Sequence, residues 1–236
     1  MKVKTQEELD ASDEKLEGES KSWALRIPCG EVTLSGDLEI PPNPVGFVFF
    51  AHGSGSSRFS RRNRAVARVL RVAGVATLLF DLLTEDEEAI DSYTAHLRFD
   101  IGLLTRRLVT VTEEMSDDPR VCGLGLGYFG SSTGGAAALR AAAALGAKIK
   151  AVVSRGGRPD LAGDALHYVK ADTLLIVGER DEDVLRLNET AYEQLNCEKA
   201  LAVVPDATHL FEEPGALEEV ARLAAEWFAK HLKSQL

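Results

Sequence analysis

The stretch GLGLGYFGSSTGG, residues 123–135, decides the fold, because its glycines are compatible with two different classes of enzyme. G-x-G-x-x-G, starting at Gly125, is typical of a dinucleotide-binding turn. G-x-S-x-G, centred on Ser132, is typical of the sharp turn that presents a nucleophilic serine. Both patterns need a strand before the glycines and a helix after them, so the rest of the chain has to discriminate between them.

The dinucleotide pattern also needs an acidic residue about 20 positions further on, which binds the ribose hydroxyls. No Asp or Glu occurs from Ser131 to Arg158, and the first acid after that is Asp160. The glycines also come in the middle of the chain, after two other predicted strand–helix units. The sequence therefore disfavours a dinucleotide, and we expect neither a cofactor nor a metal site.

The nucleophile pattern selects one of two neighbouring serines. Gly130 and Gly134 stand two residues before and after Ser132, where glycine relieves the crowding of a sharp strand-to-helix turn. Ser131 has no glycine at either of these positions. The turn places Ser132 at the N-terminus of an Ala-rich segment predicted to be a helix, whose N–H groups favour developing negative charge. Taken alone, the motif is also compatible with a plain glycine-rich turn.

A serine hydrolase of this type needs an acid and then a histidine further along the chain. The segment GERDEDV, residues 178–184, follows a predicted strand, and within it we favour Asp181 as the acid, with Asp183 as the alternative. His209 follows the next predicted strand, in the loop DATHLFEE before the last helix. Because both loops follow late strands, their side chains can converge on Ser132.

An oxyanion hole needs two backbone N–H donors. One is the N–H of Thr133, the residue after the nucleophile. The other comes from the loop after the first central strand, AHGSGSSR, in which we expect Ser54 to be the donor. In this loop His52 is predicted to brace the backbone through hydrogen bonds and to have no catalytic role.

Three arginines are candidates for binding a substrate carboxylate through paired hydrogen bonds. Arg58 follows the oxyanion loop, whereas Arg155 and Arg158 follow the strand AVVS. The alternative is that they pair with internal acids such as Asp160 or Asp81, or face water.

Apolar runs that alternate with segments of helical spacing predict the architecture. Strands are expected at 45–51, 75–80 and 121–126, and at IKAVVS, TLLIVG and ALAVVP, with helices between them and an amphipathic helix at the end. ALRIP, EVTL and GDLEI are predicted as short antiparallel strands. The pattern therefore predicts an α/β fold, with a mostly parallel sheet, antiparallel N-terminal strands and helices on both faces.

The predicted organisation is a polar tail at 1–21 followed by a single domain at 22–236, without a large cap domain. The polar segment 82–100 is predicted to form part of a small lid over the site.

The composition restricts the partners. With 27 Lys and Arg against 37 Asp and Glu, the net charge of -10 disfavours nucleic acids and anionic membrane surfaces. We find no apolar segment of the kind that a secretory signal or a membrane span needs. The three cysteines are far apart and predict neither disulfides nor a zinc site. We expect a cytoplasmic protein whose partner is a small-molecule ester, and a homodimer is left open.

The chain resembles the α/β-hydrolases and, among them, the dienelactone hydrolase-like family. The resemblance covers residues 24–233 and is carried by FFAHGSGSSR, LLFDLLT, LRFDI, YFGSSTGGAAAL, VVSRGGRPDL, LLIVGERD and PDATHLFEEPG. Dienelactone hydrolases proper use a cysteine nucleophile, whereas this chain has Ser132 at that position. The resemblance therefore implies an α/β-hydrolase fold and a catalytic triad, but not dienelactone activity itself.

The predicted function is that of a serine carboxylesterase, which forms an acyl-enzyme with small soluble esters through Ser132, Asp181 and His209. Lactonases, thioesterases and acyltransferases share this machinery, so they remain alternatives within the enzymes. A non-catalytic binding module that keeps the turn geometry is the alternative outside them.

Overall fold

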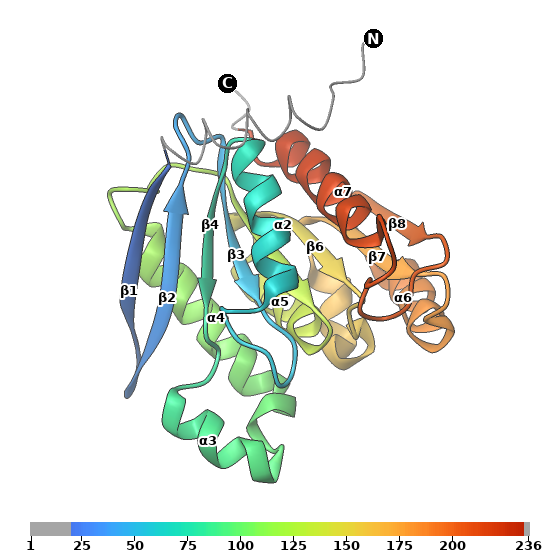
Figure 1. Cartoon of the computed structure of the whole chain (residues 1–236), viewed down its shortest axis with the longest axis horizontal. Coiled ribbons are helices and arrows are strands. Elements are labelled where there is room, and N and C mark those ends of the chain that lie inside the picture. The colour runs from blue at the N-terminus through green and yellow to red at the C-terminus, as the bar shows by residue number, and fades with distance from the viewer. Residues whose placement is uncertain (1–19, 234–236) are drawn as a thin grey trace.

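The computed structural model describes residues 20–233, which form an eight-stranded sheet flanked by helices (Figure 1). The strand order is β1-β2-β4-β3-β5-β6-β7-β8. The first two strands are antiparallel to their neighbours and the remaining pairs are parallel, as predicted. The strands are β1 Lys21–Cys29, β2 Val32–Ile40, β3 Gly46–Ala51, β4 Val75–Phe80, β5 Leu126–Ser131, β6 Ile149–Arg155, β7 Asp172–Gly178 and β8 Lys199–Val204.

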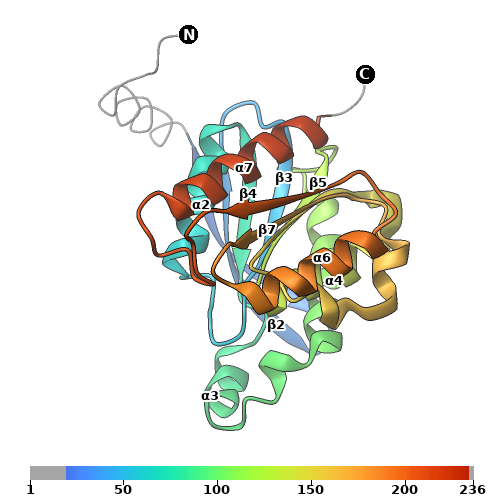
Figure 2. The ribbon, with the colours of Figure 1, turned by 90° about the vertical axis from the view of Figure 1, so that its right-hand side faces the viewer.

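Helices cover both faces of the sheet, as predicted (Figure 2). On one face, α2 and α7 pack against each other and share one apolar core with the sheet. On the other face α4, α5 and α6 enclose a second core. The α3 helix projects beyond the carboxyl ends of the parallel strands (Figure 1). The helices are α2 Arg61–Val72, α3 Glu85–Thr94, α4 Ile101–Ser116, α5 Thr133–Leu145, α6 Glu182–Gln194 and α7 Ala216–His231.

The central strands are largely apolar because both of their faces are covered. In β3, Phe49 packs against Tyr128 on one face, with ring centroids 5.9 Å apart. The next residue, Phe50, packs against Phe129 on the other face, at 4.9 Å. No helix among residues 20–233 is long and apolar enough to cross a membrane.

Two predictions of strands were wrong in detail. The strand predicted at 121–126 begins only at Leu126, because residues before it form a turn in which Gly123 has φ +82°. The segments EVTL and GDLEI form a single strand, β2, with Gly36 inside it. The strand has a glycine at position 36 because the side chains of neighbouring strands crowd the space that a Cβ would occupy there. The predicted tail at 1–21 lies almost wholly outside the described residues, and Lys21 already belongs to β1.

The glycines at 125 and 127 allow α7 to lie directly on β5. A Cβ on Gly125 would lie 2.2 Å from the carbonyl oxygen of Leu232, just after α7. A Cβ on Gly127 would lie 2.9 Å from Cε1 of Phe228. Gly125 and Gly127 therefore allow α7 to pack closely. This packing explains the first two glycines of the G-x-G-x-x-G pattern, which the serine turn does not need.

Candidate active site

Ser132 lies on a strained turn between β5 and α5. Its backbone has φ 50° and ψ -121°, a conformation that residues other than glycine rarely adopt. The turn packs so tightly against β3 that a Cβ on Gly134 would lie 2.1 Å from the carbonyl oxygen of Ala51. A Cβ on Gly130 would lie 2.6 Å from the carbonyl oxygen of Gly134. Both glycines are therefore required by the close approach of backbone to backbone.

Asp181 and His209 are brought together by the ends of two neighbouring strands. Asp181 follows β7 at the N-cap of α6, and His209 follows β8. The Nδ1 atom of His209 donates a hydrogen bond to Oδ2 of Asp181 at 2.6 Å. The bond to an ionised acceptor is short and strong, and it leaves Nε2 as the nitrogen that can accept a proton.

Asp183, the alternative acid, is far less suited to this role. Its side chain is 91% exposed and pairs with Arg186 one turn further along α6. The arrangement therefore places Asp181, and not Asp183, against the imidazole.

The loop after β6 contacts both the serine turn and His209. The N–H of Ser132 donates to the carbonyl oxygen of Arg155 at 3.2 Å, and the N–H of Arg158 donates to that of Ser132 at 3.1 Å. A Cβ on Gly156 would lie 3.5 Å from Nδ1 of His209. Within residues 20–233, Oγ of Ser132 makes no hydrogen bond. Catalytic hydrogen bonds of this kind often tighten only when substrate is bound.

The predicted oxyanion loop lies directly on the serine turn. A Cβ on Gly53 would lie 3.1 Å from Cβ of Ser132. The N–H of Ser54 donates to Oγ1 of Thr133 at 2.9 Å, so it would have to release this bond before it could bind an oxyanion. Sequence reasoning did not predict this contact, because it assigned a role to the backbone N–H of Thr133 and not to its hydroxyl, which accepts the hydrogen bond.

His52 holds the oxyanion loop in place through two hydrogen bonds, as predicted. Its Nε2 accepts a hydrogen bond from the N–H of Leu82 at 3.0 Å, so Nδ1 carries the proton and donates to the carbonyl oxygen of Gly53, also at 3.0 Å. Burial lowers the pKa of His52, which keeps the ring neutral.

Two of the three candidate arginines are engaged with internal acids. Arg58 forms a close ion pair with Asp81, the residue after β4. Arg158 makes two hydrogen bonds to Asp160, at 2.8 and 2.7 Å. Their charges are matched within the protein, which is the alternative that the sequence left open.

Arg155 differs from these two because it is buried without a carboxylate. It is 7% exposed, and within residues 20–233 its Nε and Nη1 atoms have no hydrogen-bond partner. Its guanidinium lies over the ring of Phe211, 5.9 Å from the centroid. Burial, with the nearby charge of Arg62, lowers the pKa of Arg155 to about 10, so it remains a cation at neutral pH.

A cavity of about 490 Å³ adjoins the oxyanion loop on the side of α3. The segment predicted as a lid, 82–100, supplies one of its walls, through α3 and the residues before it. Sequence reasoning missed Phe59, whose half-exposed ring also lines the cavity. The lining includes His52, Gly55, Phe59, Leu83, Glu88 and Ala89.

The comparison with solved structures finds the same fold. The crystal structure of dienelactone hydrolase from Anabaena variabilis ATCC 29413 is 58% identical, with a TM-score of 0.90. The match covers 91% of this chain and 100% of that one. Est1E from Butyrivibrio proteoclasticus has a TM-score of 0.74 at 19% identity, over 88% of this chain and 98% of that one, and shows the fold alone.

The comparison with curated proteins finds relatives from two strains of Mycobacterium tuberculosis, both named "Putative phosphoribosyl transferase". Each is 55% identical over 208 residues, which are 88% of this chain but 46% of the relative. This chain thus spans less than half the length of the curated relatives it matches. No family model matches the chain.

Proposed function

Because the chain belongs to the dienelactone hydrolase family of α/β-hydrolases, we propose that it is a serine-dependent carboxylic ester hydrolase. Ser132 is the proposed nucleophile, His209 the base and Asp181 the group that orients the base. The observation that carries the proposal is the 2.6 Å hydrogen bond between Asp181 and His209, at the strand ends next to the strained serine turn.

The chemistry proceeds through an acyl-enzyme. Nε2 of His209 accepts the proton of Ser132 as Oγ attacks the ester carbonyl carbon, and the C–O bond to the alcohol breaks as the alcohol takes up that proton. Water then attacks the acyl-enzyme with the same base, which releases the acid and restores the serine. Asp181 stabilises the imidazolium in both steps, and the N–H groups of Thr133 and Ser54 are the proposed donors to the oxyanion.

Small esters are the proposed substrates, with the cavity beside α3 as the place for one of their two groups. Of the three arginines, Arg155 is the one without a carboxylate partner among residues 20–233, and we assign to it the binding of a substrate carboxylate. A comparison of neutral and carboxylated esters in Arg155→Met tests this role, because only the carboxylated esters should lose turnover.

A fluorophosphonate probe, followed by mass spectrometry, tests the nucleophile. We expect labelling on Ser132 and a fall of about 10⁴-fold or more in kcat for p-nitrophenyl acetate in Ser132→Ala. Ser131→Ala is the matched control, because Ser131 precedes the turn and should keep its activity. Undiminished turnover in Ser132→Ala would refute the assignment, and a folded wild-type protein that never labels would favour the binding module.

The name of the mycobacterial relatives does not compete with this proposal. This chain covers only 46% of the length of the proteins with that name. It covers the whole length of the dienelactone hydrolase from Anabaena variabilis. Lactonase, thioesterase and acyltransferase activities share the triad, and an ester library of varied acyl length and charge would separate them.

A further inference from the structure

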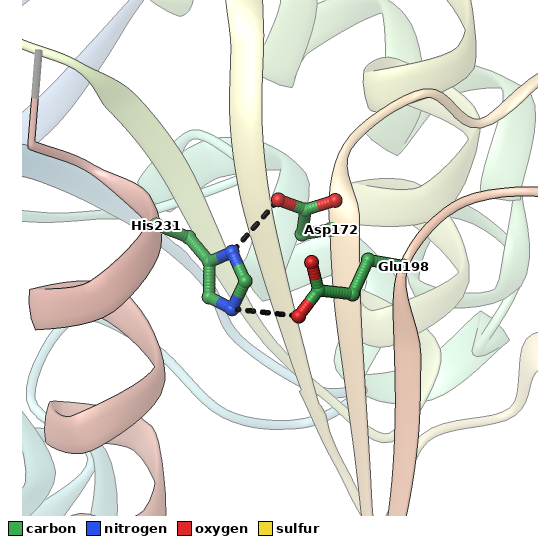
Figure 3. Close-up of side chains that lie close together, drawn as sticks. All are labelled: Asp172, Glu198 and His231. Carbon is green, nitrogen blue, oxygen red and sulfur yellow. Dashed lines mark hydrogen bonds and ion pairs between the residues drawn. The ribbon is translucent and has the colours of Figure 1, made fainter. Parts of the chain in front are cut away.

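Three side chains converge at the edge of the sheet opposite the candidate active site (Figure 3). Asp172 is the first residue of β7, Glu198 directly precedes β8, and His231 is the last residue of α7. Each offers one potential metal-ligand atom, and these atoms lie within 4.8 Å of one another. The seven residues of β7 put this cluster roughly 20 Å from the triad, so it is separate from the proposed chemistry.

His231 provides the sign that a ligand belongs here. Its side chain is 5% exposed, and Nδ1 donates a hydrogen bond to Oδ2 of Asp172 at 2.7 Å. Nε2 is buried and has no hydrogen-bond partner within residues 20–233. Oε1 of Glu198 lies 3.7 Å from Nε2, the contact marked by the lower dashed line in Figure 3; it is an ion pair only when the imidazole is protonated and is too long for a hydrogen bond. A buried nitrogen left in this state is costly unless another group binds it.

The gap between Nε2 and Glu198 suits a metal ion. Two ligands that each lie about 2.1 Å from a Zn²⁺ ion, at the tetrahedral angle of about 110°, are about 3.4 Å apart. The 3.7 Å separation between Nε2 and Oε1 is close to that value. Asp172 accepts the hydrogen bond from Nδ1 and so orients the ring with Nε2 towards the gap. Many zinc-bound histidines are oriented in this way by a carboxylate that does not itself bind the metal.

We propose that His231 and Glu198, with Asp172 behind the imidazole, form a binding site for Zn²⁺ or a similar divalent transition-metal ion. Imidazole with carboxylates is a donor set typical of zinc. A cavity of about 690 Å³ adjoins the cluster, so water can complete the coordination. The bound ion ties the end of α7 to the starts of β7 and β8, and its role is therefore to stabilise the fold.

Lys230 is the competitor for this site. Its Nζ lies 2.6 Å from Oε1 of Glu198, and it lowers the pKa of that carboxyl group, which keeps it ionised. The Lys230 side chain is 64% exposed, so its pair with Glu198 is weak and its flexible stem can move the ammonium into water when a cation binds. Removal of this lysine should therefore strengthen metal binding, an effect that a purely structural ion-pair cluster does not predict.

Isothermal titration of the untagged full chain with Zn²⁺ tests the proposal. All proteins in the test carry His209→Asn, which removes the other histidine–carboxylate pair. We expect about one zinc per chain, at least tenfold weaker binding in His231→Asn, and severalfold tighter binding in Lys230→Met. Asn can keep the bond to Asp172 through its side-chain amide while it removes Nε2. His167→Asn, at an exposed position in the 3₁₀ segment Pro159–Tyr168, is the control and should bind as the parent does.

A second variant keeps the test decisive if His231→Asn fails to fold. Glu198→Gln lies at an exposed position, should leave the fold intact, and should also weaken zinc binding at least tenfold. Thermal unfolding with zinc should give a shift that these variants lose. The proposal is wrong if no saturable binding appears up to about 100 μM zinc, or if Glu198→Gln and His231→Asn bind as tightly as the parent.

Discussion

Asp181→Asn is the change that most directly tests how the candidate triad works. In the structure, the carboxylate of Asp181 accepts the Nδ1 proton of His209 at 2.6 Å. An amide in its place carries no charge to stabilise the imidazolium. Its NH₂ group can also donate to Nδ1, which moves the imidazole proton to Nε2 and blocks the acceptance of a proton from Ser132.

The expected loss can be worked out from this contact. The centres of charge of a carboxylate and an imidazolium in this geometry are about 4 Å apart, which corresponds to about 4 kcal/mol at an effective dielectric constant of about 20. At about 1.4 kcal/mol per factor of ten, this energy is equivalent to about 10³-fold in rate. The His209 side chain is 39% exposed, so water weakens this term, while the wrong tautomer adds to the loss. We therefore expect kcat/KM to fall by about 10³-fold to 10⁴-fold.

The assay is steady-state hydrolysis of p-nitrophenyl acetate at neutral pH, with urea unfolding to show that each variant is folded. Asp183→Asn is the matched control, because Asp183 lies in the first turn of the same helix but pairs with Arg186 at the surface. Its kcat/KM should stay within about twofold of the wild-type value. The reasoning fails if Asp181→Asn keeps more than a tenth of the wild-type activity, or if Asp183→Asn loses as much.

Three further predictions concern the surroundings of the triad. Gly134→Ala places a Cβ 2.1 Å from the carbonyl oxygen of Ala51, so urea unfolding should show a loss of about 1–3 kcal/mol in stability; an unchanged midpoint would contradict the close approach. Stability should fall as the pH drops below about 6.5, because burial lowers the pKa of His52 in the folded state, while the imidazole of the unfolded chain already takes up a proton. In His52→Gln the free energy of unfolding should depend less on pH in this range. An equal pH dependence in the wild type and the variant would contradict the role of His52. Arg155→Met removes a buried cation without a carboxylate partner, so the free energy of unfolding should rise by about 1 kcal/mol or more, whereas a fall would show that the guanidinium stabilises the fold.

Much of the fold could be predicted because parallel strands covered on both faces are continuous apolar runs. The strand β3, with Phe49 and Phe50 buried on opposite faces, is such a case. The start of β5 was misplaced because glycines and apolar residues before Leu126 look like strand but form a turn. Asp181 and His209 could be named because the loops after neighbouring parallel strands meet at one edge of the sheet.

Other features depend on contacts that carry no signal in the sequence. For Arg58 and Arg158 the sequence left open whether they bind a substrate or pair with internal acids such as Asp81 and Asp160, and only the fold shows that they pair with these acids. The Asp172, Glu198 and His231 cluster has no characteristic spacing, because its members come from two strand starts and a helix end. Absence of a cysteine motif therefore could not exclude a metal site built from such distant residues.

The proposed nucleophile, Ser132, is the point where this chain departs from dienelactone hydrolases proper, and we argue that the departure favours an enzyme over a binding module. A thiol ionises partly near neutral pH, whereas a serine hydroxyl does not, so Ser132 depends on an oriented base. The start of α5 can stabilise negative charge at the turn, but it cannot remove the proton. A module that only binds its ligand has no use for the 2.6 Å bond between Asp181 and His209, nor for a serine held at φ 50°. The strained serine and the oriented imidazole together therefore support the proposed catalytic role over a role in binding alone.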